Sequence, residues 1–268
     1  MTSSAFNNGK PTVLITGASG GIGLELARIF ARQGHNLVLV ARSTEKLEAL
    51  ASELSAKHGI QTLALSSDLA APTAPQQVYD QVSAKNVAVE VLVNNAGIGN
   101  YGPFHENDVE TDLTVARLNM IALTHLTRLF LPGMVQRKRG RILNIASTAA
   151  FLPGPLMAVY YASKHYVLAL SEALAEELAG TGVTVTTLCP GPTRTSFQDR
   201  ASMQESKLIQ SGMMEVTTVA EAGYRGLMVG QRVIVPGIFN QITAFLPRLL
   251  PRRLVTRMVM QAQGRVGH

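Results

Sequence analysis

The feature that most constrains the fold is a glycine-rich turn set between a strand pattern and a helix pattern. Thr12–Thr16 is a short apolar, β-branched run typical of a strand buried in a parallel sheet, and Leu24–Gln33 is amphipathic at helical spacing. Gly17, Gly21 and Gly23 lie between them. Glycines allow a tight turn and let backbone N–H groups at a helix N-terminus approach a pyrophosphate. We therefore expect a dinucleotide-binding turn rather than a flexible loop.

Strand and helix patterns alternate along the rest of the chain. Strands are expected at Thr12–Thr16, Asn36–Ala41, Gln61–Ser66, Val89–Val93, Arg141–Ala146, Val183–Leu188 and Arg232–Val235, and helices at Leu24–Gln33, Thr44–Lys57, Ala74–Ala84, Asp108–Arg137, Val159–Leu178 and Val219–Met228. This alternation predicts an α/β fold, a doubly wound, Rossmann-like parallel sheet of about seven strands with helices on both faces. No linker divides the sequence, so residues 11–268 are expected to form a single domain after a flexible N-terminus at residues 1–10.

Polar residues follow several of these strands, at the edge where parallel sheets bind ligands. The second strand ends in Ala41 and Arg42 rather than in the acidic residue that commonly binds the ribose of NAD. An arginine suits a 2′-phosphate, so NADP(H) is the expected cofactor, and the alternative is a solvated arginine at a helix start. Asp68 and Leu69 follow the third strand, near the expected adenine. Asn94–Gly97 ends the fourth strand.

A tyrosine and a lysine stand one helical turn apart near the centre of the chain. Tyr160 and Lys164 share one helix face, and Ser147 follows the fifth strand. A nearby cation favours the phenolate and lowers the pKa of a tyrosine, which then becomes a usable acid or base near neutrality. The serine could hydrogen-bond the same substrate oxygen. In isolation, a packing aromatic beside a solvated lysine is the simpler interpretation.

One polar side chain interrupts an apolar helix pattern. Asn119, within the sequence Arg-Leu-Asn-Met-Ile-Ala, needs a hydrogen-bonding partner if it is buried. It either bends the helix and holds a water or is a satisfied core amide.

Composition excludes several classes of protein. The net charge is +6, but seven arginines and no acid follow Glu221, which leaves 17 basic and 18 acidic groups elsewhere. This clustering argues against nucleic-acid binding, which needs basic and aromatic residues over a whole face. The single cysteine, Cys189, excludes an intramolecular disulfide and is expected to be a small core residue near the cofactor. The six histidines lack ligand spacing, so no metal site is expected. A polar N-terminus and no long apolar run favour a soluble, cytoplasmic protein.

Two C-terminal segments leave alternatives open. Residues 196–218 lose periodicity and contain Met203, Met213 and Met214. They are expected to form either a mobile lid that covers an apolar substrate or an ordinary surface loop, and the lid is slightly favoured. Residues 238–268 form a basic tail in which apolar residues and arginines alternate at helical spacing. This tail could lie on an anionic membrane, close an acyl-CoA-like pocket, pack against a second subunit, or simply cap the domain with a solvated face.

In combination, these motifs resemble the short-chain dehydrogenase/reductase family, in its compact single-domain branch. The matching residues, all in the family's order, are Thr16, Gly17, Gly21, Gly23, Asn94–Gly97, Asn119, Ser147, Tyr160, Lys164, Pro190 and Gly191. They cover about residues 12 to 195. Two departures are Gly20, where many NADP-dependent members carry a basic residue, and Thr193, which replaces an aliphatic residue and is expected to keep only backbone contacts.

The resemblance implies roles for these residues. Tyr160 would be the catalytic acid or base, and Lys164 would bind the nicotinamide ribose and lower the tyrosine pKa. Ser147 would orient the substrate oxygen, and Asn119 would support a water in a proton relay. The implied cofactor contacts are Gly17, Ser19, Gly21, Ile22, Gly23, Arg42, Asp68, Leu69, Asn95, Ala96, Gly97, Tyr160, Lys164, Pro190, Gly191, Thr193 and Thr195.

The expected activity is that of an NADPH-dependent carbonyl reductase, or the reverse alcohol dehydrogenase, acting on an apolar small molecule. One rival hypothesis is a non-catalytic NADP(H)-binding regulator, which would not need the four catalytic residues. A second is a membrane-surface scaffold that acts through the basic tail. The helix segment Tyr166–Leu178 carries small and leucine side chains, and pairing through it is expected to give a homodimer or homotetramer.

Overall fold

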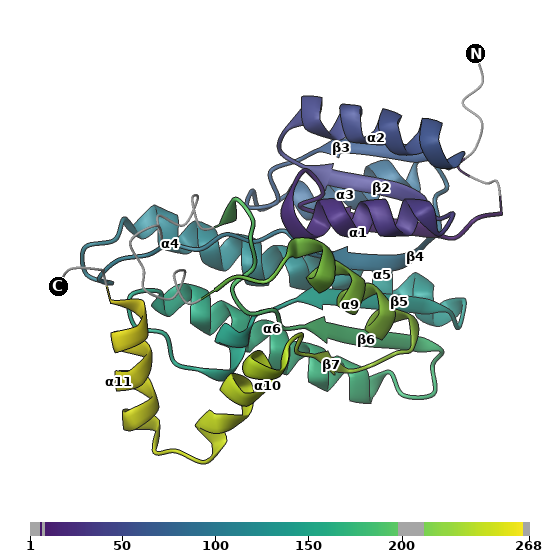
Figure 1. Ribbon diagram of the computed structural model, residues 1–268. Coiled ribbons are helices and arrows are strands. Elements are labelled where there is room, and N and C mark those ends of the chain that lie inside the picture. The colour runs from purple at the N-terminus through teal and green to yellow at the C-terminus, as the bar shows by residue number, and fades with distance from the viewer. Residues whose placement is uncertain (1–5, 7–8, 198–211, 265–268) are drawn as a thin grey trace.

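Apolar strands buried on both faces form the centre of the protein. The computed structural model describes Phe6 and residues 9–197 and 212–264. Within these residues seven parallel strands pair in the order β3-β2-β1-β4-β5-β6-β7 (Figure 1). They are β1 (Thr12–Thr16), β2 (Asn36–Ala41), β3 (Thr62–Ser66), β4 (Val89–Asn94), β5 (Gly140–Ile145), β6 (Val183–Leu188) and β7 (Val233–Ile234).

Helices cover both faces of this sheet. They are α1 (Gly21–Arg32), α2 (Thr44–His58), α3 (Ala74–Ser83), α4 (Val109–Ala116), α5 (Leu123–Gln136), α6 (Ala158–Glu177), α9 (Val216–Met228), α10 (Ile238–Phe245) and α11 (Arg252–Gln263). Val13 and Ile15 of β1 pack with α1, α2 and α9, whereas Leu14 packs with α3 and α5 on the other face. Because alternate side chains enter opposite cores, the strands are apolar throughout. The predicted doubly wound α/β fold is confirmed.

The strand order places the ligand edge. The chain runs outward from β1 to β2 and β3, then returns to β4 beside β1 and continues through β5, β6 and β7. The sheet order therefore reverses between β1 and β4. In open parallel sheets, ligands bind beyond the carboxyl ends of the strands at such a reversal.

One predicted helix is wrong in detail. The single helix expected at Asp108–Arg137 is two α-helices, α4 and α5, joined by a wider π-helical segment at Arg117–Ala122. Asn119 lies in this segment, and its side-chain amide forms two hydrogen bonds with the backbone of Ile98. Such π segments are frequent at functional sites.

Smaller differences concern element ends. α1 starts at Gly21, three residues before the predicted start, since the last glycines of the turn already form the first helical turn. α9 likewise begins at Val216. β7 is limited to Val233–Ile234 because only two residues pair with β6.

The C-terminal segments only partly fall within the described residues. Most of the predicted lid, including Met203, lies outside them, as does most of the predicted flexible N-terminus. Met214 pairs with Thr193 through an isolated parallel bridge. The tail forms α10, a short 3₁₀ turn at Leu246–Arg248, and α11. None of the helices in the described parts of the chain has the length and apolar character needed to cross a bilayer.

Candidate active site and cofactor crevice

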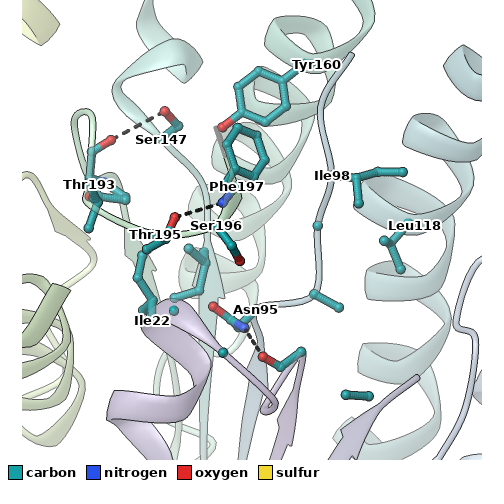
Figure 2. A pocket seen from close by; sticks show the side chains of 18 of the residues that line it. Ile22, Asn95, Ile98, Leu118, Ser147, Tyr160, Thr193, Thr195, Ser196 and Phe197 are labelled. Atoms are coloured by element: carbon teal, nitrogen blue, oxygen red, sulfur yellow. Dashed lines mark hydrogen bonds between the residues drawn. The ribbon is translucent and has the colours of Figure 1, made fainter. Parts of the chain in front are cut away.

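A crevice of about 450 Å³ opens at the carboxyl ends of the strands. Its lining runs from the glycine turn at Gly17–Ile22, past Asn95–Gly97, to Ser147 and Tyr160. Figure 2 shows Ile22 and Asn95 toward one end of the pocket and Ser147, Tyr160 and Phe197 toward the other. Residues distant in sequence therefore share one elongated site, at the place predicted from the strand order.

The glycine turn is shaped for close approach of a ligand backbone. Gly17 and Gly21 have φ values of +65° and +56°, which L side chains rarely adopt. A Cβ on Gly23 would lie 2.4 Å from the carbonyl oxygen of Gly17 and from Asn95 Nδ2. Helix α1 begins here with no side-chain cap, so no side chain occupies the first backbone N–H groups of the helix. This arrangement fits a dinucleotide pyrophosphate.

The turn is held in place by a hydroxyl at the end of β1. Thr16 Oγ1 accepts the backbone N–H groups of Asn95 and Ala96 at 2.9 and 3.0 Å. The Asn95 side chain in turn donates to the Thr16 carbonyl oxygen at 2.8 Å. The Asn-Asn-Ala-Gly motif thus fixes β4 against the glycine turn and leaves Gly97 at the crevice wall.

Two cations lie at the end of β2. Arg42 and Lys46 both line the crevice and are exposed, one helical turn apart, with Ser43 between them as the N-cap of α2. Neither forms an ion pair within the described residues. Asp68 and Leu69 line the same crevice. The sequence pattern indicated Arg42 but not Lys46.

Asn119 is a satisfied buried amide within the π-helical segment. Its Oδ1 accepts the Ile98 N–H at 3.0 Å, and its Nδ2 donates to the Ile98 carbonyl at 2.9 Å and to Ser163 Oγ at 3.0 Å. Asn119 does not line the crevice but ties the crevice wall to the helix that carries Tyr160. Of the two alternatives drawn from the sequence, these hydrogen bonds match the satisfied core amide, and the bound water stays a prediction.

The hydroxyls of Ser147 and Tyr160 lie together. Ser147 caps the 3₁₀ turn Thr148–Phe151, where its Oγ accepts the Ala149 N–H at 3.1 Å. The same hydroxyl donates to the Pro190 carbonyl oxygen at 3.4 Å. It also lies close enough to the phenol of Tyr160 to lower its pKa in part, and both side chains line the crevice. Strand β5 and helix α6 thereby present two hydroxyl groups to one point in the crevice.

The pKa of Tyr160 differs from the sequence-based expectation. Burial raises it above its ordinary value, and the nearby Ser147 hydroxyl lowers it only in part. Lys164, which was expected to make the phenol acidic, is not among the groups that lower its pKa, and desolvation of the phenol is the largest effect. Tyr160 therefore holds its proton at neutral pH and is set up as a proton donor.

Lys164 lies deeper than the phenol and is tied to β5. Its ammonium donates to the Ile145 carbonyl oxygen at 2.9 Å and lies 5.6 Å from the centre of the Tyr160 ring. The side chain is only 6% exposed, and burial lowers its pKa to about 8. Lys164 also lies beside Gly97, where an added Cβ would be 3.5 Å from Nζ.

The far end of the crevice is apolar and built from separated segments. Met157, Tyr161 and Phe197 line it, and the Phe197 ring lies 5.3 Å from the Tyr160 ring. Val255 and Val259 of α11 pack into the same cluster. These residues come from three separate parts of the chain.

Helix α11 is anchored behind this end by a buried glutamine. Gln263 is fully buried, and its Nε2 donates to the hydroxyl of Tyr161. Tyr101 donates its own hydroxyl to the Gln263 backbone oxygen. The tail is therefore an ordered wall behind the crevice, which agrees with the helical spacing of its sequence, whereas the contacts of Gln263 were not predicted.

Most residues predicted as site members line the crevice. Those that do are Gly17, Ser19, Gly21, Ile22, Arg42, Asp68, Leu69, Asn95, Ala96, Gly97, Ser147, Tyr160, Lys164, Pro190, Gly191, Thr193 and Thr195. Gly23 and Asn119 do not line the crevice but support its lining, Gly23 by packing against Gly17 and Asn119 by bonding Ser163. Thr193 is buried, and its hydroxyl donates to the Gly191 carbonyl at 2.9 Å, so its side chain does more than the backbone contacts expected of it. Lys46, Met157, Tyr161 and Phe197 were missed.

Two further features bear on the chemistry. Cys189 is a buried core residue, as predicted, and burial raises the pKa of its thiol to about 12, so it is an unreactive thiol. No group of three or more potential metal-ligating side chains occurs among the residues that the structure describes.

Comparison with known proteins decides the family. Residues 11–206 match the family model of short chain dehydrogenases. This chain belongs to the short-chain dehydrogenase family. Its membership explains the agreement between the ordered motifs and the crevice, where the glycine turn, Ser147, Tyr160 and Lys164 meet.

Several members of the short-chain dehydrogenase family are similar to this chain. The very-long-chain 3-oxoacyl-CoA reductase of Phaeosphaeria nodorum is 38% identical over 186 residues, which are 68% of this chain and 54% of that protein. The chain thus spans about half the length of this curated relative. An NADPH-bound short-chain dehydrogenase from Sphingobium yanoikuyae is 35% identical with a TM-score of 0.81, covering 96% of this chain and 98% of that one. The bulky-bulky ketone specific alcohol dehydrogenase of Comamonas testosteroni is 29% identical with a TM-score of 0.76, covering 96% of both chains.

Proposed function

We propose that this oxidoreductase is an NADPH-dependent reductase of ketones or aldehydes, which works in reverse as an alcohol dehydrogenase. The observation that carries the proposal is that the hydroxyl-bearing side chains of Ser147 and Tyr160 line the same crevice as the glycine turn, whose geometry fits a pyrophosphate. When bound, NADPH would supply the hydride that a carbonyl carbon accepts.

The protein's own groups would act on the substrate oxygen. Ser147 donates a hydrogen bond that orients the carbonyl, and Tyr160 transfers its proton to the oxygen as the alcohol forms. A buried phenol with a raised pKa is protonated at neutral pH, which suits reduction better than oxidation. Lys164 lies behind the phenol and can return a proton to it, because its own pKa is lowered to about 8.

The preference for NADP(H) rests on the cations at the end of β2. Arg42 and Lys46 border the crevice beyond Ala41, and a 2′-phosphate there would gain charge-assisted hydrogen bonds. The similar protein from Sphingobium yanoikuyae, described with bound NADPH, agrees with this preference.

The substrate end favours an apolar carbonyl compound. Met157, Tyr161 and Phe197 offer aromatic and thioether surface around the hydroxyl pair. Similar proteins are named for very-long-chain 3-oxoacyl-CoA and for bulky ketones. We infer a ketone with an extended apolar group as the substrate class.

Association of copies through α6 stays a prediction. The segment Tyr166–Leu178 leaves Tyr166, Ala169 and Ala173 exposed along one side.

The proposal is tested with wild-type enzyme and the Tyr160→Phe variant on a panel of aldehydes and bulky ketones, following NADPH oxidation. Wild type should reduce at least one apolar ketone faster with NADPH than with NADH. The variant should bind NADPH with unchanged affinity but lose turnover by roughly 10²- to 10⁴-fold, the usual contribution of a positioned acid. Unchanged turnover in the variant would falsify the mechanism.

A further inference from the structure

Helix α10 exposes its apolar face instead of burying it. Ile238, Phe239, Ile242 and Phe245 are 63%, 82%, 53% and 55% exposed, whereas the only buried residue of this helix is Ala244. Positions 238, 242 and 245 recur at helical spacing on one side. An amphipathic surface helix normally turns its apolar stripe toward the core, whereas α10 leaves its stripe exposed to solvent.

The exposed stripe continues beyond the helix into the joint with α11. Leu246 and Leu249 are also exposed, at 40% and 67%. Figure 1 shows this joint at the edge of the molecule, far from β3 and α2. Large exposed apolar patches of this kind mark sites that bind another protein or a membrane.

Arginines surround the joint without acidic partners. Arg248, Arg252 and Arg253 are exposed, and none forms an ion pair within residues 9–197 and 212–264. No Asp or Glu follows Glu221 in the sequence. We call Phe239, Ile242, Phe245, Leu246 and Leu249, with Arg248, Arg252 and Arg253, the C-terminal patch.

The patch lies on ordered structure. Val255, Val259 and Gln263 fix the buried side of α11 against Tyr101 and Tyr161. The exposure of the C-terminal patch therefore belongs to the folded structure and does not result from fraying of the chain end.

We propose that the C-terminal patch docks on the surface of an anionic phospholipid bilayer. Aromatic and leucine side chains enter the interface between headgroups and acyl chains, and the arginines meet the headgroup phosphates. An apolar stripe bordered by unpaired cations matches such a surface in both chemistry and charge.

A second copy of the chain fits this patch less well. A two-fold contact would place the same face of both copies together, and therefore the same three arginines near each other. The tail offers no carboxylate to neutralise them. The docking does not depend on the proposed reaction, since no patch residue lines the crevice.

Sedimentation of the full-length protein with vesicles tests the docking. Vesicles of phosphatidylcholine with phosphatidylserine should bind it at low salt, and vesicles of phosphatidylcholine alone should bind it much more weakly. The triple variant R248Q/R252Q/R253Q should lose roughly a hundredfold in partitioning to the anionic vesicles. The variant F239S/F245S should also bind weakly, because the apolar contribution is removed.

A matched control separates the patch from net charge. K57Q/K85Q/R225Q removes the same number of charges at exposed positions outside the patch and should keep most of the wild-type partitioning. Unchanged NADPH affinity in every variant reports an intact fold. The proposal is overturned if anionic vesicles do not bind the wild type, or if the control loses as much as the patch variant. It is also overturned if F239S/F245S retains vesicle binding and instead dissociates an oligomer in light scattering.

Discussion

The two ends of the crevice are built in different ways. The cofactor end is made by strand termini and short turns, and its key distances are set by backbone atoms, as between Gly23 and Gly17. The substrate end is made by side chains from separate segments, such as Met157 and Phe197, with α11 packed behind them. One end is fixed by local geometry, and the other by tertiary packing.

This difference decides what each end can tolerate. At Gly23 the backbone cradle accepts no added atom without movement of the main chain. A wall of apolar side chains can change its shape while the fold persists. The cofactor end therefore suits one invariant ligand, and the substrate end can be adapted to different carbonyl compounds.

Among variants that compare the two ends, the largest expected effect comes from adding one methyl group to the cradle. Gly23→Ala places a Cβ 2.4 Å from the Gly17 carbonyl oxygen, so the turn must shift. We expect the Kd for NADPH, measured by fluorescence titration, to rise roughly a hundredfold. Gly20→Ala is the matched control, because a Cβ there meets nothing within 4 Å. Equal affinities for the two variants would show that the cradle is not rigid.

The buried lysine between the two ends should give a pH-dependent stability. The pKa of Lys164 is about 8 in the folded protein and near 10.5 when exposed, so below pH 8 the fold must bury a charge. This cost lessens as the pH rises from 8 to 10.5, because the unfolded chain then binds more protons than the folded one.

Urea unfolding of the wild type and of Lys164→Met at a series of pH values measures this effect. Between pH 7 and pH 10 the wild type should gain roughly 2 to 3 kcal/mol of unfolding free energy relative to the variant. The comparison removes contributions common to both proteins, such as Tyr160, whose raised pKa costs stability only above its ordinary value. A difference that does not vary with pH would mean that Lys164 is charged at no cost.

The cations at the end of β2 should tune the choice of nucleotide. Arg42→Ala combined with Lys46→Ala should lower the preference for NADPH over NADH by about 10- to 50-fold, the value of one or two charge-assisted hydrogen bonds. Ratios of kcat/KM for the two nucleotides measure it. Lys57→Ala, on the same helix but outside the crevice, should leave the ratio unchanged. A double variant with the wild-type ratio would rule out 2′-phosphate recognition at this position.

The smallest expected effect is at the substrate end. Phe197→Ala removes a ring 5.3 Å from that of Tyr160 and should lower kcat/KM for a bulky ketone about tenfold. The NADPH affinity should not change, since the ring belongs to the other end. Loss of NADPH affinity with unchanged ketone kinetics would reverse the assignment of the two ends.

The cofactor end was largely predictable from sequence, and the substrate end was not. Thr12–Thr16 and Val183–Leu188 agree with β1 and β6 to the residue, because glycine or proline stands close to both ends of each apolar strand. The glycine turn, Arg42 and Asn95 could be placed because strand ends meet at one edge of a parallel sheet.

The misses have physical causes. The π segment at Asn119 depends on hydrogen bonds to Ile98, which lies 21 positions earlier in the chain. Gln263 bonds Tyr161 across 102 positions, and no local pattern reports such a contact. The raised pKa of Tyr160 depends on burial by neighbours, whereas the sequence showed only the spacing to Lys164.

A crystal structure of the protein with NADP⁺ and a bulky ketone tests the central claim most directly. The account predicts the ketone oxygen within hydrogen-bonding distance of both Ser147 Oγ and the Tyr160 hydroxyl, with its apolar group against Phe197 and Met157. A ketone oxygen held by other groups, with Tyr160 screened from it by packed protein, would contradict the account.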